Sequence, residues 1–204
     1  IDYRPDGIKY QILTDSINTI KVNTGGRFTV YNSLCAIGCA TTLGVSIADI
    51  SAALAKLNGV KGRAEAIPTE KDYTVIIDYA HTPDALENVL KTLREIAPDH
   101  ELICLFGCGG DRDKTKRPEM AAIAQKFADR MIITSDNSRT EKTSDIMADI
   151  KEGLDISGRA RSLFIEDREE AIRTAIMIAG QGATILLAGK GHEKYEIDGE
   201  GKHP

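Results

Sequence analysis

The sequence predicts an α/β fold built around a parallel sheet with helices on both of its faces. In the second half of the chain, short apolar runs alternate with longer segments whose apolar residues recur at helical spacing. Such alternation builds right-handed βαβ units, in which neighbouring strands run parallel. The predicted strands cover about residues 73–78, 102–106, 130–134, 162–165 and 184–188. The predicted helices cover about residues 83–97, 116–128, 143–153 and 167–179.

The first of these strands leads directly into a helix, and the junction carries two candidate functional residues. Residues 75–77, Val-Ile-Ile, form the kind of apolar run that a buried strand shows, and Asp78 ends it. Thr82 is a suitable helix N-cap, and Pro83 suits the first helical turn. Asp78 and His81 therefore lie at the carboxyl edge of the predicted sheet, where ligands bind in open α/β folds.

Polar clusters also follow three later strands. Residues 107–114, Gly-Cys-Gly-Gly-Asp-Arg-Asp-Lys, offer glycine amides that can surround an anion and basic side chains that can pair with it. Residues 134–141 read Thr-Ser-Asp-Asn-Ser-Arg-Thr-Glu, and residues 189–193 read Gly-Lys-Gly-His-Glu. The last segment is not the phosphate loop Gly-x-x-x-x-Gly-Lys-Ser/Thr, and the chain contains no such loop.

Taken singly, each of these residues also has a structural explanation. Asp78 suits a strand-end turn, and His81 suits a partly buried structural position. Arg112 and Arg139 suit an exposed surface. Because all the clusters fall on one edge of one sheet, we favour a binding site over this set of separate explanations.

The first part of the chain has a different pattern. It predicts two strands, at residues 7–13 and 18–22, then helices at 32–43 and 46–57. The loop at 59–63 combines two glycines with two basic residues and marks a domain boundary. We therefore expect one domain over residues 1–62 and another over 63–204.

Composition narrows the class of protein. The 204 residues include 26 basic and 31 acidic side chains, for a net charge of −5, which argues against a nucleic-acid-binding surface built on overall charge. We find no apolar run long enough for a membrane span and no signal peptide, which predicts a protein without membrane insertion. The four cysteines are expected to be buried thiols of a reduced cytoplasmic protein, and we predict no metal ligands among them.

The clusters together resemble a known family. Residues 78–86, 107–113, 116–118 and 189–193 are similar, in order and spacing, to motifs of the MurE type of Mur ligase, the UDP-N-acetylmuramoyl-tripeptide synthetases. The resemblance extends over nearly the whole chain, because Val30-Tyr31-Asn32 and Gly62-Arg63 also match in order.

The resemblance implies an ATP-dependent enzyme of peptidoglycan synthesis that forms an amide bond through an acyl phosphate. Such enzymes have a UDP-sugar domain, a central ATP-binding domain and a Rossmann-like C-terminal domain. This chain resembles the end of the central domain followed by most of the C-terminal domain, truncated at both ends. ATP and Mg²⁺ are the implied cofactors, with Mg²⁺ held mainly by the missing part of the central domain. We therefore expect no catalytic residue in this fragment, and no turnover by the fragment alone.

The resemblance also assigns roles to individual residues. Four residues would bind ATP: Asn32 at the adenine, Arg63 at the nucleotide, Asp78 at the ribose and His81 near the phosphates. Six would bind the incoming amino acid: Arg112, Asp136, Asn137, Arg139, Gly189 and Glu193. The implied substrates are UDP-N-acetylmuramoyl dipeptide and meso-diaminopimelate. The arginines suit the distal carboxylate of diaminopimelate and Glu193 suits its distal ammonium group.

Two substitutions separate this chain from the family pattern. Residues 136–139 read Asp-Asn-Ser-Arg, where diaminopimelate enzymes of the family have Asp-Asn-Pro-Arg, and Ala64 stands where a methionine is common. Arg139 is retained and favours diaminopimelate, whereas lysine-adding relatives often lack that arginine. The alternatives are a lysine-adding enzyme, another Mur ligase or folylpolyglutamate synthetase, and a binding module without activity.

Overall fold

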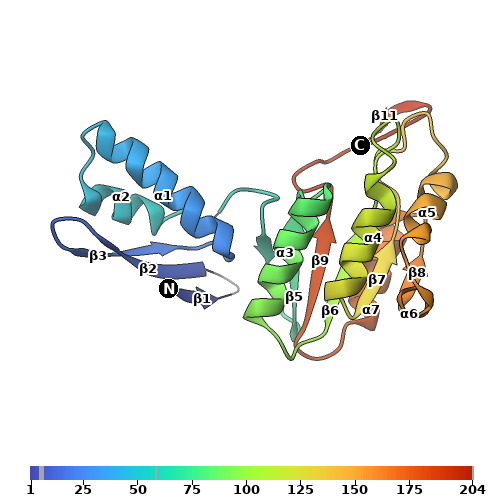
Figure 1. The fold of residues 1–204 in the computed structure, drawn as a ribbon, viewed down its shortest axis with the longest axis horizontal. Helices are drawn as coiled ribbons and strands as arrows, with labels where there is room; N and C mark the ends of the chain where they lie inside the picture. The colour runs from blue at the N-terminus through green and yellow to red at the C-terminus, as the bar shows by residue number, and fades with distance from the viewer. Residues whose placement is uncertain (5–6, 58, 204) are drawn as a thin grey trace. The chain divides into compact units, whose positions relative to one another are not determined.

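The computed structural model of the chain describes residues 1–4, 7–57 and 59–203 and divides into two compact units (Figure 1). The first unit is Ile1–Val60 and the second is Lys61–Pro204. The division falls inside the loop at 59–63, two residues before the boundary predicted from the sequence.

The first unit is a small antiparallel sheet with two helices on one face. Its strands, in the order β1-β2-β3, are β1 (Asp2–Arg4), β2 (Gly7–Leu13) and β3 (Ile17–Val22). Its helices are α1 (Arg27–Thr42) and α2 (Ile47–Leu54). The register pairs Ile8 with Val22 and Tyr10 with Ile20, so these four side chains share the face that packs against the helices. They form a buried core with Val30, Ile37, Ile50 and Leu54.

Two sequence predictions for this unit are wrong. Helix α1 begins at Arg27, not at Asn32, because Val30 packs into the core and the Thr29 hydroxyl donates to the Gly25 carbonyl oxygen (2.8 Å) within the first turn. Cys35 and Cys39 are exposed, because the buried face of α1 passes through Val30, Ser33 and Ile37 instead. Cys104 and Cys108, in the second unit, are buried as expected.

The second unit contains a six-stranded sheet in the order β4-β5-β9-β6-β7-β8. The strands are β4 (Glu65–Ile67), β5 (Tyr73–Asp78), β6 (Leu102–Phe106), β7 (Arg130–Ile133), β8 (Ser162–Phe164) and β9 (Ala183–Ala188). All neighbours pair in parallel except β4, which runs antiparallel to β5. The predicted parallel sheet is confirmed. The sequence did not predict β4, whose three residues depend on β5 for their hydrogen bonds.

Helices cover both faces of this sheet, as predicted. They are α3 (Pro83–Ile96), α4 (Lys116–Phe127), α5 (Thr143–Glu152), α6 (Ile156–Ala160) and α7 (Arg168–Ile178). Alternate residues of β6 point to opposite faces: Leu102, Cys104 and Phe106 join the core under α3, α4 and α5, and Ile103 and Leu105 join the core under α7. A hairpin, β10 (Glu196–Asp198) and β11 (Gly201–His203), follows β9 and was not predicted.

The strand order decides which loops meet. Because β9 lies between β5 and β6, the segment after Ala188 emerges between the loop that follows Asp78 and the loop that follows Phe106. The loop after β7 lies next to the loop after β6. In the part of the chain that the structure describes, no helix has the length and apolar character needed to cross a membrane.

Candidate ligand-binding site

A cavity of about 640 Å³ opens at the carboxyl edge of the six-stranded sheet, within the second unit. Seven of the ten residues predicted to bind ATP or the amino acid line it: His81, Arg112, Asp136, Asn137, Arg139, Gly189 and Glu193. The whole predicted amino-acid set is therefore gathered in one place. The other lining residues are Tyr79, Thr82, Pro83, Asp84, Gly109, Asp113, Lys116 and Glu119.

The cavity carries charges of both signs. Its cationic side chains are Arg112, Lys116 and Arg139. Its carboxylates are Asp84, Asp113, Glu119, Asp136 and Glu193. A wall of mixed charge suits a ligand that itself carries both ammonium and carboxylate groups, because each ligand charge can find a partner of opposite sign.

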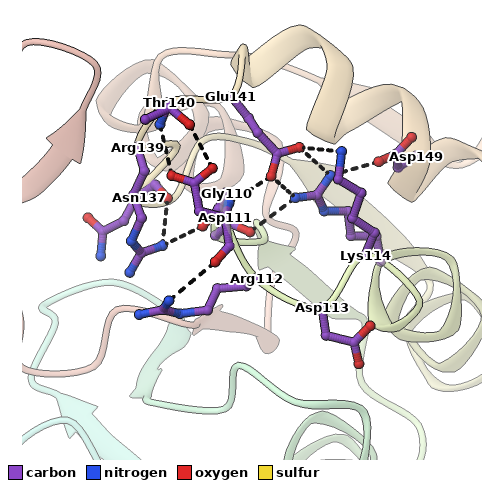
Figure 2. Close-up of polar contacts among 12 residues, drawn as sticks. Gly110, Asp111, Arg112, Asp113, Lys114, Asn137, Arg139, Thr140, Glu141 and Asp149 are labelled. Atoms are coloured by element: carbon purple, nitrogen blue, oxygen red, sulfur yellow. Dashed lines mark hydrogen bonds and ion pairs between the residues drawn. The ribbon is translucent and has the colours of Figure 1, made fainter.

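Arg139 is held in place by backbone oxygens. Its Nη1 donates to the carbonyl oxygens of Gly110 (2.8 Å) and Asn137 (3.2 Å) (Figure 2). Its amide donates to the Ile197 carbonyl oxygen (3.0 Å). Within the described ranges no acceptor is assigned to its Nε or Nη2, so those donors remain for a ligand. Arg112 is exposed, and its Nη1 donates to the Asp111 carbonyl oxygen (3.2 Å). The two guanidinium groups thus come from adjacent loops.

Glu193 is oriented by two neutral donors. The Tyr79 hydroxyl donates to its Oε1 (3.1 Å), and the Asn137 Nδ2 donates to its Oε2 (3.0 Å). In the part of the chain that the structure describes, Glu193 has no cationic partner, so its negative charge is available to a ligand. The hydrogen bond to Glu193 raises the pKa of Tyr79, with burial as a second cause, because it stabilises the protonated phenol.

Asn137 is buried and fixes this arrangement through both ends of its amide. Its Oδ1 accepts hydrogen bonds from Lys190 Nζ (3.0 Å) and the Ile197 amide (2.9 Å). The two donors at Asn137 Oδ1 and the acceptor Glu193 at Asn137 Nδ2 are both consistent with one orientation of the Asn137 amide. Lys190, whose role was not predicted from the sequence, also donates to the Tyr195 carbonyl oxygen (2.7 Å).

Gly189 follows β9 and Asp136 follows β7, the two strands on either side of β6, and the two residues meet beyond the end of β6. Gly189 has a φ of 107°, which residues other than glycine seldom adopt. A Cβ at this position would also lie only 2.9 Å from Asp136 Oδ2, so both the backbone conformation and the close contact favour glycine. Arg168 lies beside them, donating to the carbonyl oxygens of Ser135 (2.8 Å) and Ala188 (2.9 Å). Burial lowers the pKa of Arg168. This role was missed from the sequence, because Arg168 begins α7 and lies outside the polar clusters.

His81 presents one ring nitrogen for interaction. Its Nδ1 lies 2.8 Å from the Tyr79 carbonyl oxygen, which can only accept, so Nδ1 carries a proton. The Nε2 atom is then the nitrogen that remains for a ligand. Lys116 donates to the His81 carbonyl oxygen (2.8 Å), which joins this turn to the start of α4.

The remaining three predicted ATP-binding residues lie outside the cavity. Asp78 accepts backbone hydrogen bonds from Ala64 and Ala80, each 2.7 Å long, and fixes the segment at 62–64 to the end of β5. Burial raises the pKa of Asp78, and these two hydrogen bonds act against the rise. The Arg63 guanidinium lies over the Tyr79 ring, 4.3 Å from its centroid. Asn32 is exposed on α1 of the first unit.

Comparison with known proteins identifies the family. Residues 62–191 match the family model of the Mur ligase, glutamate ligase domain. The chain belongs to the Mur ligase family. The resemblance found in the sequence is confirmed, and the second unit has the α/β fold of the Mur ligase C-terminal domain.

Curated relatives cover almost all of this chain. The UDP-N-acetylmuramoyl-L-alanyl-D-glutamate–2,6-diaminopimelate ligase of Clostridioides difficile (strain 630) is 47% identical over 199 residues, which are 97% of this chain and 41% of the relative. The ligase of the same name from Synechococcus elongatus is 48% identical over 205 residues, covering 99% of this chain and 40% of the relative. The chain thus spans about two fifths of the length of these Mur ligases.

Solved structures of related ligases have the same fold as this chain. One titled UDP-N-acetylmuramoyl-L-alanyl-D-glutamate–2,6-diaminopimelate ligase has a TM-score of 0.70 at 38% identity and covers 99% of this chain and 41% of its own. A folylpolyglutamate synthase from Thermotoga maritima has a TM-score of 0.71 at 19% identity, over 92% of this chain and 42% of its own. At that identity the second likeness shows a shared fold alone.

Proposed function

We propose that the chain is the amino-acid-binding part of an ATP-dependent ligase that joins meso-diaminopimelate to UDP-N-acetylmuramoyl-L-alanyl-D-glutamate. The curated relatives support this, since their names give the same dipeptide and 2,6-diaminopimelate. The first unit is then the end of a central ATP-binding domain, and the second is the C-terminal domain. The product is a peptidoglycan precursor, so the protein acts in the cytoplasm, where ATP and nucleotide-linked sugars are available.

The observation that carries the proposal is that the cavity presents both positive and negative side chains with hydrogen-bonding atoms available to a ligand. Arg139 offers Nε and Nη2, a pair of donors that matches the two oxygens of a carboxylate. Arg112 comes from the neighbouring loop and reaches the same cavity. Glu193, held by neutral donors, suits an ammonium group. Diaminopimelate carries two groups of each sign, and L-lysine lacks the distal carboxylate that the arginines would bind.

These residues act on the reaction by orienting the incoming amine. Fixing the distal end of diaminopimelate directs its other amino group toward the acyl phosphate of the muramoyl dipeptide. A correctly held nucleophile avoids much of the entropy loss of a bimolecular reaction. Asn137 contributes indirectly, because it fixes both Glu193 and Lys190.

Three of the residues assigned to ATP from the sequence, Arg63, Asp78 and His81, lie in the second unit. Arg63 and the His81 Nε2 suit phosphate oxygens. Each oxygen of Asp78 accepts one backbone amide and keeps a lone pair for a ribose hydroxyl. The assignment of Asn32, in the first unit, to the adenine stays a prediction from the sequence. Mg²⁺ is the expected companion of ATP, whose phosphate charge it would neutralise. Among the described residues, no three acidic, histidine or cysteine side chains gather as its ligands.

Calorimetric titration of the chain tests the substrate directly. We expect saturable binding of meso-diaminopimelate and much weaker binding of L-lysine. The Arg139→Ala variant should lose roughly 10- to 100-fold in affinity for diaminopimelate, the equivalent of about 1.5–3 kcal/mol for hydrogen bonds between charged groups. Arg173→Ala is the matched control, because Arg173 is exposed on α7, where it pairs with Glu169, and it does not line the cavity.

Two results would refute this assignment. Lysine binding that is as tight as diaminopimelate binding, and indifferent to Arg139, would favour a lysine-adding enzyme. Failure of both amino acids to bind would mean that the cavity is not an amino-acid site in this chain.

A further inference from the structure

Glu141 is the centre of a polar network just outside the cavity. Its carboxylate accepts hydrogen bonds from the Asp111 amide (2.7 Å) and from both terminal nitrogens of Arg117 (2.8 and 3.0 Å). Lys114 Nζ lies 2.9 Å from the same carboxylate, and Figure 2 shows these contacts converging on it. Asp111 and Lys114 belong to the loop after β6, and Glu141 belongs to the loop after β7. Glu141 therefore ties two loops together.

The anchor of this network is rigid. The Arg117 side chain is fully buried, at 0% exposure, in the first turn of α4. Its Nη1 also donates to Asp149 of α5 (2.7 Å), and its Nη2 donates to the Gly109 carbonyl oxygen (3.3 Å). Arg117 thus connects Glu141 to α4 and, through Asp149, to α5.

A second set of contacts joins the same two loops. The Asp111 carboxylate accepts hydrogen bonds from the Thr140 hydroxyl (2.7 Å) and amide (3.2 Å). The Gly110 amide donates to the Asn137 carbonyl oxygen (2.9 Å). A Cβ at Gly110 would overlap the carbonyl oxygen of Ser138, so the backbones are in direct contact. These contacts therefore hold the loop after β6 and the loop after β7 together.

The two loops also contain strained backbone. Asp111 has a φ of 51° and Arg139 a φ of 52°, in the left-handed region that side chains other than glycine seldom adopt. Such residues persist only where surrounding contacts fix them. Asp111 is fixed by Thr140 and Glu141, which lie one and two residues beyond Arg139. Releasing these contacts would remove the restraint on Asp111 and weaken the connection between the two loops, while Arg139 keeps the hydrogen bond from its amide to Ile197.

We propose that Glu141 is a positioning residue of the cavity, which holds Arg112 and Arg139 as a pair facing a ligand carboxylate by tying their loops together. Glu141 does not line the cavity itself, so it acts through the two arginines. This inference rests on the proposed function for the identity of the ligand. It adds a residue whose contribution to diaminopimelate affinity is indirect.

The test combines affinity with local hydrogen exchange in the Glu141→Gln variant of the chain. Because losing one hydrogen bond between charged groups lowers affinity by roughly tenfold or more, we expect at least about a tenfold loss in meso-diaminopimelate affinity when the arginines are displaced. Amide exchange should accelerate at residues 109–112 and 137–141 while exchange in β6 stays at the wild-type rate. Glu152→Gln is the control, since it removes the same charge from an exposed position on α5.

Thr140→Val provides a second variant that leaves the buried Arg117 network intact. It removes one hydroxyl contact to Asp111, and we expect the same two effects at smaller size. Unchanged diaminopimelate affinity in Glu141→Gln, with affinity lost in Arg139→Ala, would overturn the proposal. So would lost affinity without faster exchange in the two loops, or an equal acceleration throughout β6. If the wild-type chain does not bind diaminopimelate, the proposed function fails, and the exchange data still decide whether Glu141 ties the loops.

Discussion

Replacing Arg117 with methionine is the perturbation whose effect on stability the structure defines best. Methionine has a similar length but no charge, so it fills the same space and removes every hydrogen bond of the guanidinium. Glu141 loses two donors and Asp149 loses one. The Nε of Arg117 is buried without an acceptor among the described residues. Burying an unpaired donor costs free energy, and the methionine variant removes that cost.

The lost contacts and the removed Nε together set the change in the free energy of unfolding. Removing one partner of a buried ion pair costs about 3–5 kcal/mol. Glu141 keeps Lys114 and the Asp111 amide, and the Asp149 side chain is 38% exposed and can bind water, so the low end applies. Removing the unpaired Nε stabilises the variant by about 1 kcal/mol, the low end of the cost of a buried polar group without a hydrogen bond. The expected net loss is therefore about 2 kcal/mol.

The assay is native-state hydrogen exchange of the β6 amides, Leu102–Phe106. These residues are wholly buried and report unfolding of the second unit alone, whereas an optical melt would mix the transitions of two units. Arg173→Met is the control, because its pair with Glu169 has side chains 75% and 76% exposed and should contribute less than about 0.5 kcal/mol. A loss for Arg117→Met no larger than that of the control would refute the reasoning.

Three further predictions concern acid stability, thiol reactivity and one glycine. Hydrogen bonds from Arg117 and Lys114 hold the pKa of Glu141 well below its usual value, so its contribution is complete above about pH 4.3 and is lost as the pH falls through the lowered pKa. The difference in unfolding free energy between wild type and Glu141→Gln should be larger at about pH 7 than at about pH 3; equal differences would contradict this. Burial raises the pKa of Cys104 and Cys108 to about 12, so a thiol reagent at about pH 8 should label the exposed cysteines of α1 and spare this pair until the protein unfolds. Gly189→Ala forces a Cβ against Asp136 Oδ2 at a φ of 107° and should cost about 1–3 kcal/mol by the same exchange assay, with wild-type stability as the contrary outcome.

The fold was predictable where local sequence decides it. The strand at 73–78 and the helix beginning at Pro83 were correct, because an apolar run, an N-cap and a proline all lie next to one another in the chain. The structure places the Thr82 hydroxyl as the acceptor of the Ala85 amide (3.4 Å), as expected of an N-cap. Strand β4 and the hairpin β10–β11 were missed, because their few residues are strands only through their pairing partners.

The candidate site was predictable where it follows from topology. Parallel strands end at one edge, so the polar clusters after β6, β7 and β9 had to meet. What the sequence did not reveal was which side chains hold others in place. Arg168 and Lys190 act on carbonyl and amide groups brought close only by folding. Tyr79 had a local signal, since it lies between Asp78 and His81, but its hydrogen bond to Glu193 spans 114 positions.

The serine at position 138 shows how this chain presents Arg139 without the proline of the related motif. A proline would restrict one backbone torsion before Arg139, and Ser138 does not. Here Ser138 is buried, its carbonyl oxygen accepts the Glu141 amide (3.1 Å), and the Arg139 amide and Nη1 bind three carbonyl oxygens. Because those contacts use only the amide and Nη1, the guanidinium is restrained on one side while its other donors remain for a carboxylate. Rigidity at this position therefore comes from hydrogen bonds between loops, which is why we expect it to depend on Glu141.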